Sequence, residues 1–209
     1  SIWFAGGKID PRSCFAGHCP LEEFNRLPRQ QRYVSGCAML VRREVFDKIG
    51  LIDERFFIYY EDDDFCLRAS KTGYRIEVVE GARMYHKVSS YSGGQGSGSP
   101  FQAYNQLRSS LLFWRKHLGW WAFHRRFCGG HLGKWVNTLP VQWANESTRA
   151  TVEAVINALW YYISGKRRPR EQPPAPEWFK RLMLQRPWLG AESMALRFIP
   201  TAQGLFKQS

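Results

Sequence analysis

The sequence lacks the patterns that mark membrane-spanning, disulfide-stapled or repeat proteins. No uninterrupted apolar run reaches the ~18 residues that a membrane-spanning helix needs. The cysteines are odd in number and irregular in spacing, which excludes a regular disulfide framework and predicts a reducing, cytoplasmic compartment. They are Cys14, Cys19, Cys37, Cys66 and Cys128. No secretory signal pattern opens the chain, and no segment repeats along it.

Negative charge is also scarce, because 18 Asp and Glu stand against 30 Lys and Arg, a formal net charge of +12. Such an excess favours anionic partners and leaves nucleic acid, anionic lipid and phosphorylated substrates open. The acidic residues concentrate between Ile52 and Glu80, whereas most of the positive surplus follows Arg108. An acidic cluster inside a basic protein suggests catalytic carboxylates or a cation site, with a solvated loop as the alternative.

The chain up to about His117 alternates short apolar runs with turn residues, which predicts an α/β sheet. Helices are expected over residues 43–49, before Gly50, and over residues 63–72, before Gly73. Compact apolar or aromatic runs predict strands over residues 37–41, 56–60, 75–79 and 83–86.

The rest of the chain reads as mainly helical and basic. Residues 89–100 are rich in Gly and Ser, which indicates a passive linker or an active-site loop. Apolar residues then recur at helical spacing between Tyr104 and Leu118 and between Val152 and Ile163, before a basic run at residues 166–168. Residues 169–176 are proline-rich. We therefore expect three regions, 1–100, 101–168 and 169–209, the second of them basic and suited to contact with an anionic membrane.

The sharpest local feature is a run of four carboxylates, Glu61-Asp62-Asp63-Asp64, directly after an aromatic segment. Adjacent carboxylates repel one another, so such a run indicates a cation, a basic partner or a proton-transfer role. Helix N-capping is the plainer interpretation, but it accounts for one or two acids rather than four.

This acidic motif, read with its surroundings, resembles the second half of family-2 inverting glycosyltransferases of the GT-A (Rossmann-like) fold. Rhamnosyltransferase-like and galactofuranosyltransferase-like members of bacterial cell-surface polysaccharide synthesis are the nearest in pattern. The resembling stretches, in the family's order, are residues 3–7, 33–43, 46–57, 61–68, 73–75 and 82–86. The resemblance predicts a C-terminal GT-A half followed by helices. It also predicts that the family's nucleotide-binding half would precede Ser1, so that this chain alone would be inactive.

The resemblance further assigns roles. It implies that Asp62 is the catalytic base beside Glu61, and that His86 binds a divalent cation, Mg²⁺ or Mn²⁺, shared with the preceding half. The donor is then a nucleotide sugar, and the acceptor a glycan or lipid-linked hydroxyl group. The residues expected to bind donor or acceptor are Trp3, Gly6, Gly7, Ser35, Gly36, Asp64 and Arg68.

Two other interpretations stay open from the residues themselves. The basic charge and nine Trp residues would suit a nucleic-acid-binding module, although the acidic run argues against it and no nucleic acid is expected. His117, His124, Cys128 and His131 share roughly helical spacing and suggest zinc, but Gly129-Gly130 is expected to break that helix.

Overall fold

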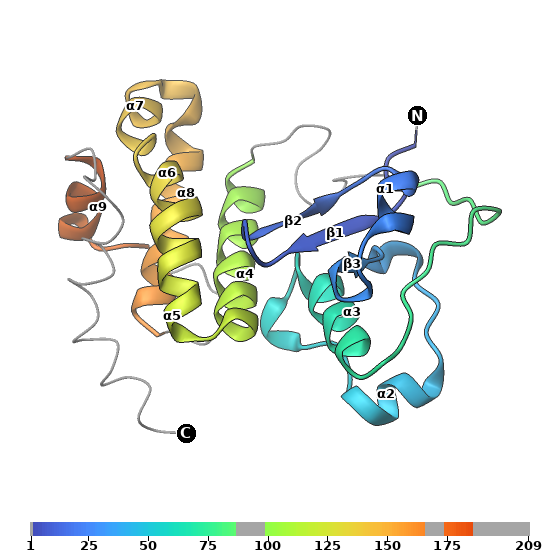
Figure 1. Ribbon diagram of the computed structural model, residues 1–209. Coiled ribbons are helices and arrows are strands. Elements are labelled where there is room, and N and C mark those ends of the chain that lie inside the picture. The colour runs from blue at the N-terminus through green and yellow to red at the C-terminus, as the bar shows by residue number, and fades with distance from the viewer. Residues whose placement is uncertain (1, 87–98, 166–173, 186–209) are drawn as a thin grey trace. The chain divides into compact units, whose positions relative to one another are not determined.

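The computed structural model describes residues 2–86, 99–165 and 174–185, which belong to two compact units, Ser1–Val88 and Ser89–Ser209 (Figure 1). The functional division predicted above, 1–100, 101–168 and 169–209, stays a prediction. Most of the Gly/Ser-rich segment, the basic run at 166–168, much of the proline-rich stretch and the last 24 residues lie outside the described residues.

The first unit contains a three-stranded antiparallel sheet in the order β2-β1-β3. The central strand β1 (Gly7–Asp10) pairs along its length with β2 (Phe15–His18), and Gly7 lies opposite both His18 and Tyr33. The short β3 (Arg32–Tyr33) follows α1 (Leu21–Arg26) and η1 (Arg29–Gln31). The mixed α/β class is therefore confirmed, although helices predominate and the sheet is small.

The two helices predicted in this unit are present, and each ends at the predicted glycine. Helix α2 (Arg43–Ile49) stops at Gly50 with φ 77°, and α3 (Glu61–Lys71) is followed by Gly73 with φ 98°. Glycine adopts this left-handed conformation without steric cost, so both helices end where the sequence says. Short 3₁₀ turns, η2 (Gly36–Ala38) and η3 (Glu54–Phe56), connect them to the sheet.

All four strand predictions are wrong. Residues 37–41 begin in η2, because the Ser35 side chain accepts a hydrogen bond from the Cys37 N–H and caps a turn instead. Residues 56–60 contain three left-handed residues, which no strand tolerates. Residues 75–79 and 83–86 are not strands, because no neighbouring strand among the described residues pairs with them.

The apolar core of this part of the unit lies between α2 and α3, around Val45, Phe65 and Ala69. Inward-facing residues from two non-helical segments, near residues 39–41 and 74–76, pack against it. The same segments line a groove of about 590 Å³. Leu40, at the groove, and Val79 are exposed. Residues 75–78 make no backbone hydrogen bond with other described residues, so they form an open edge.

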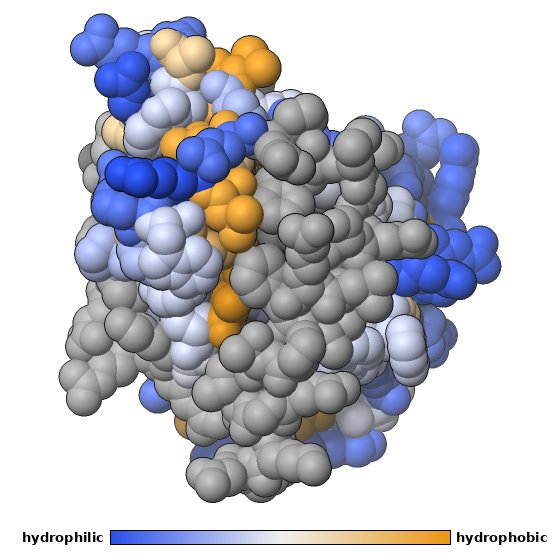
Figure 2. Space-filling model, turned by 90° about the vertical axis from the view of Figure 1, so that its left-hand side faces the viewer, coloured by the Kyte–Doolittle hydropathy of each residue, from blue (hydrophilic) through white to orange (hydrophobic). Residues whose placement is uncertain are grey.

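The second unit is helical over its described residues. Its long helices α4 (Pro100–Leu118) and α8 (Glu146–Ile163) pack against each other, as their predicted apolar stripes require. Shorter elements complete it: α5 (Trp120–Ala122), η4 (Phe123–Leu132), α6 (Gly133–Val136), α7 (Leu139–Ala144) and α9 (Glu177–Leu184). Figure 2 shows apolar side chains in a strip on one face of this unit, with hydrophilic side chains beside it.

Gly129-Gly130 does not break the helix here, contrary to expectation. Element η4 is a π-helix that runs through both glycines, and Phe123 and Phe127 are buried within the unit. The described residues contain no cluster of three His, Cys, Asp or Glu side chains able to hold a metal ion, so the zinc hypothesis finds no support there. Within the same residues, no helix is long and apolar enough to cross a membrane.

Candidate active site

The acidic motif begins at a sharp reversal of the backbone. Phe57, Tyr59 and Tyr60 all have positive φ, between 58° and 67°, and Tyr60 is the residue just before α3. Bulky residues adopt this region at a cost of roughly 1–2 kcal/mol each. Three such residues in four positions indicate that the surrounding fold holds the start of α3 in a fixed place.

Asp62 lies in the first turn of α3 and is partly exposed. Its Oδ2 accepts a hydrogen bond from the Gly36 N–H at 3.0 Å, and its Oδ1 accepts one from the Asp63 N–H at 3.0 Å. The two bonds fix the carboxylate between the helix start and η2, from a residue 26 positions earlier. A carboxylate that is both oriented and reachable from solvent is suited to accept a proton.

Glu61 and Asp63, on either side of Asp62, each have a buried carboxylate oxygen. Asp63 is only 6% exposed, and its Oδ1 has no hydrogen-bond partner among the described residues. Burial, together with the neighbouring Asp62, holds the pKa of Asp63 well above its ordinary value. Burial likewise raises the pKa of Glu61. The environment therefore favours the protonated form of these two carboxyl groups.

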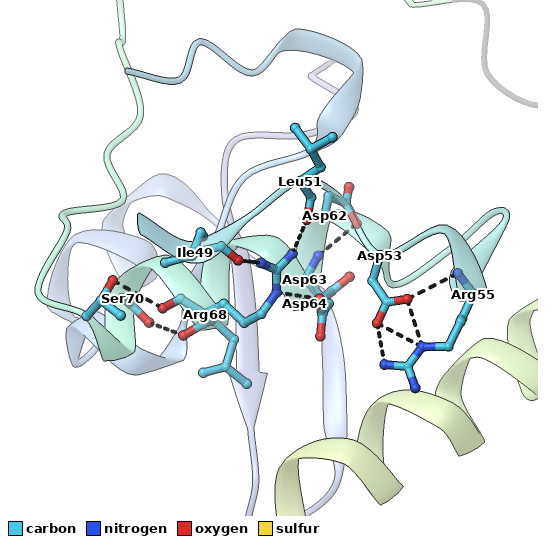
Figure 3. A network of polar contacts seen from close by, with 11 residues as sticks. Ile49, Leu51, Asp53, Arg55, Asp62, Asp63, Asp64, Arg68 and Ser70 are labelled. Carbon is cyan, nitrogen blue, oxygen red and sulfur yellow. Dashed lines mark hydrogen bonds and ion pairs between the residues drawn. The ribbon is translucent and has the colours of Figure 1, made fainter. Parts of the chain in front are cut away.

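Asp64 is fully buried and forms an ion pair with Arg68 one helical turn later, with 2.8 Å between Oδ2 and Nε. The same guanidinium donates to the backbone carbonyls of Ile49 at 2.6 Å and Leu51 at 2.8 Å (Figure 3). Arg68 therefore ties the end of α2 to α3. The predicted pairing of Arg68 with a carboxylate of the cluster is present, and Asp64 is that carboxylate. The ligand-binding roles of Asp64 and Arg68 stay predictions.

Tyr33 is a residue of the site that sequence reasoning did not single out. It is buried, and burial together with the carboxylates of Asp63 and Asp62 raises the pKa of its phenol. Tyr33 is the last residue of β3, and β3 packs against α3, the helix that begins with the acidic motif. Only its position in a family-like stretch hinted at a role. Tyr33 lies 29 positions before Asp62 in the sequence, and no local sequence pattern predicts that the two residues are close in space.

Trp3 and His86 lie in an aromatic cluster, with their ring centroids 4.8 Å apart. Trp3 also contacts His18 edge-on at 4.8 Å, and His18 Nδ1 lies 3.2 Å from the Trp3 carbonyl oxygen. Phe4 links the cluster to Tyr33, with ring centroids 5.9 Å apart. Trp3 is 42% exposed, and its role in binding a sugar stays a prediction.

The four small residues predicted to bind ligand have different surroundings. A Cβ on Gly7 would lie 2.1 Å from the Tyr33 ring, and one on Gly6 would lie 2.7 Å from Phe24. Both glycines therefore have a packing reason inside the fold. Gly36 instead faces Asp62, and Ser35 caps the turn that presents the Gly36 N–H. The structure thus brings Ser35 and Gly36 together with the acidic motif.

The described residues do not fit a complete divalent-cation site. They contain no group of three His, Cys, Asp or Glu side chains that converge on one point. His86 is exposed and rests against Trp3. A cation at His86 stays a prediction, and no chemical step below depends on it.

Cys66 lies in α3 one turn after Asp62, with its thiol 3.8 Å from the Val34 carbonyl oxygen. Only 1% of the residue is exposed, and burial raises the pKa of the thiol to about 12. It is therefore a structural side chain and not a nucleophile.

An oriented carboxylate at the start of a helix, beside an aromatic cluster, is consistent with the resemblance drawn from the sequence. The model of glycosyl transferase family group 2 matches residues 12–164, and this chain belongs to that family. The family implies the GT-A fold, of which the first unit shows only a mixed α/β part. No solved structure matches the chain.

Three relatives of the chain are named as glycosyltransferases. The chain is 32% identical over 116 residues to an N-acetylglucosaminyl-diphospho-decaprenol L-rhamnosyltransferase of Mycobacterium tuberculosis, covering 55% of this chain and 37% of the relative. It is 30% identical over 83 residues to a dTDP-rhamnosyl transferase of Shigella flexneri, covering 37% of this chain and 28% of the relative. It is 37% identical over 57 residues to a low-salt glycan biosynthesis hexosyltransferase of Haloferax volcanii, covering 27% and 18%. The chain thus spans well under two thirds of these relatives.

Proposed function

We propose that the chain supplies the acceptor-side half of an inverting glycosyltransferase in which Asp62 is the general base. The enzyme transfers a sugar from a nucleoside-diphosphate sugar to a hydroxyl group of a glycan or lipid-linked acceptor. The observation that carries this proposal is the geometry of Asp62, a partly exposed carboxylate fixed by the N–H groups of Gly36 and Asp63.

An acceptor hydroxyl group is a weak nucleophile at neutral pH. Asp62 takes its proton while the hydroxyl oxygen bonds to the anomeric carbon of the donor sugar. The bond from that carbon to the diphosphate oxygen breaks, and the diphosphate leaves with the electron pair. One displacement inverts the anomeric configuration and needs one base, unlike the paired carboxylates of retaining glycosidases. Trp3 is 42% exposed, and its indole is the side chain on which we expect a sugar to stack.

The names of the relatives suggest which donor sugar and which acceptor to test first. Two of them are named for rhamnosyl transfer and one for an acceptor carried on decaprenyl diphosphate. We therefore take dTDP-rhamnose as the first donor to test and a polyprenyl-diphosphate-linked glycan as the first acceptor, in cell-surface polysaccharide synthesis. An acceptor of that kind lies in a membrane, so the enzyme works as a peripheral protein at its cytoplasmic face.

The GT-A sheet needs more strands than the three in the first unit. Residues 75–78 and 39–41 border the groove of about 590 Å³, with apolar side chains directed inward and the backbone of residues 75–78 unpaired among the described residues. Such an edge accepts an added strand. We propose that residues outside this chain complete the sheet there. Slower amide exchange at residues 75–78 in the longer protein than in the 209-residue chain is the expected result.

The general-base role is tested with Asp62→Asn in the full-length transferase. Loss of the base lowers kcat at least ~100-fold, while the KM for the donor changes little. Asp47→Asn, an exposed carboxylate on α2, is the matched control and keeps wild-type kcat. Near-normal turnover of Asp62→Asn, or a product that keeps the donor's anomeric configuration, overturns the proposal.

A further inference from the structure

The second unit has an exposed tryptophan at one end. Helix α4 ends at Leu118, Gly119 turns the chain with φ 71°, and α5 begins at Trp120. Trp121 is 81% exposed. The Trp120 ring supports it edge-on at 5.2 Å between centroids, and His124 lies over Trp120 at 4.0 Å. An indole held outward by its neighbours is a costly arrangement in water and indicates a surface to which it binds.

Cations flank this tryptophan on both sides. Arg115 and Lys116 belong to the last turn of α4, and Arg125 and Arg126 follow Trp121 by about one helical turn. Lys116, Arg125 and Arg126 are exposed. No Asp or Glu occurs in the sequence between Glu80 and Glu146, so this stretch of the chain is positively charged. We call residues 115–126 the tryptophan tip.

The end of α8 lies at the same end of the unit. The Tyr162 ring is 5.9 Å from the Phe123 ring, and Arg115 lies beside the Tyr162 phenol. The sequence continues from there into Lys166-Arg167-Arg168, which lie outside the described residues. The acidic start of α8, at Glu146, follows α7 at the opposite end of the unit (Figure 1).

We propose that the tryptophan tip is a docking surface for an anionic lipid bilayer. Trp121 enters the interface between headgroups and acyl chains, where an indole prefers to lie, and the cations bind the phosphates around it. This inference rests on the proposed function for its reason, because a lipid-linked acceptor brings the enzyme to a membrane. The sequence predicted only that the basic region 101–168 contacts an anionic membrane; this proposal names the residues that make the contact.

A membrane explains the tip better than nucleic acid does. Single-stranded nucleic acid is bound by successive aromatic faces on which neighbouring bases stack. Among the aromatic residues of the tip, only Trp121 is largely exposed, while the Trp120 ring contacts the rings of Trp121 and His124. One outward indole with exposed cations before and after it in the chain matches an interfacial anchor instead.

The test uses the 209-residue chain and vesicles of phosphatidylcholine with or without phosphatidylglycerol, followed by co-flotation. The wild-type chain binds only the anionic vesicles, and added salt weakens binding. Arg125→Gln/Arg126→Gln lowers the partition coefficient roughly 30-fold, and Trp121→Ala lowers it about 10-fold. Brominated lipid quenches tryptophan fluorescence of the wild type and less so that of Trp121→Phe.

The matched controls are Trp178→Ala and Arg181→Gln on α9, also exposed and in the same unit, which leave binding unchanged. Circular dichroism verifies that each variant is folded. The proposal fails if the wild type does not bind anionic vesicles, or if the tip variants bind as it does. It also fails if poly(U) RNA is bound through Arg125 and Arg126 while vesicles are not. Vesicle binding needs no donor, so its failure leaves the role of Asp62 standing.

Discussion

Breaking the buried ion pair between Asp64 and Arg68 should strongly destabilise the acidic helix α3. Asp64 has no exposed surface, and the Arg68 side chain is 19% exposed. Arg68→Met keeps the aliphatic stem but removes the cation paired with the buried Asp64 and the two donors to the Ile49 and Leu51 carbonyls. Removing one partner of a buried pair costs about 3–5 kcal/mol, a large share of the 5–15 kcal/mol that stabilises an ordinary domain.

The chain offers an internal control of the same spacing. Glu22 and Arg26 on α1 form an i,i+4 pair at 2.6 Å, but both side chains are 76% exposed. Solvent screens that pair, so Arg26→Met should cost less than about 0.5 kcal/mol. Burial, and not the presence of an ion pair, sets the difference between the two variants.

Native-state hydrogen exchange of the α3 amides measures the opening free energy of this region directly. The double variant Asp64→Leu/Arg68→Met removes both charges and should recover the part of the loss that comes from the unpaired carboxylate, because apolar replacements of a buried pair are often neutral. The loss of the Arg68 hydrogen bonds to the Ile49 and Leu51 carbonyls remains in both variants. Equal destabilisation by the single and double variants would refute the reasoning. The same outcome would follow if Arg26→Met proved as damaging as Arg68→Met.

Two further predictions concern the carboxylates. Because the pKa of Asp63 is raised in the fold, the stability it contributes is present below its unfolded pKa and is lost as the pH rises through the folded value, by about 1.4 kcal/mol per pH unit. Asp63→Asn should flatten this dependence in urea unfolding between acid and neutral pH, and an unchanged slope would contradict it. Gly36→Pro removes the N–H that holds Asp62 and should lower kcat of the full-length enzyme ~10-fold or more, since a bond to a charged group is worth about 1.5–3 kcal/mol. Gly36→Ala keeps that N–H and adds a methyl at an ordinary contact distance of 3.6 Å from the Asp62 Cβ, so its kcat should stay near wild type. Equal losses of kcat in the two variants would exclude the hydrogen bond as the cause.

The helices could be predicted from sequence because their signals are local. Gly50 and Gly73 marked the ends of α2 and α3, and apolar periodicity marked α4 and α8. The strands could not, because a strand exists only where a second one pairs with it. Residues 75–79 have strand-like composition but no partner among the described residues.

The candidate site shows the same division. The carboxylates stand together in sequence, so Asp62 could be named from its motif. The groups that orient and enclose the motif, the Gly36 N–H and the Tyr33 ring, come from positions 26 and more residues away. Such distant contacts leave no periodic trace in the chain. The hydrogen bonds from Arg68 to the carbonyls of Ile49 and Leu51 could not be predicted for the same reason.

The enclosed thiol of Cys66 gives the protein a built-in reporter. Cys66 is 1% exposed, so an alkylating reagent reaches its sulfur only when α3 opens. Cys37 is exposed and reacts without any opening, so its labelling serves as the internal reference. The labelling rate at position 66 thus counts openings of the acidic helix. A bound sugar acceptor that steadies this helix would slow the labelling, so ligands can be screened without any assay of turnover.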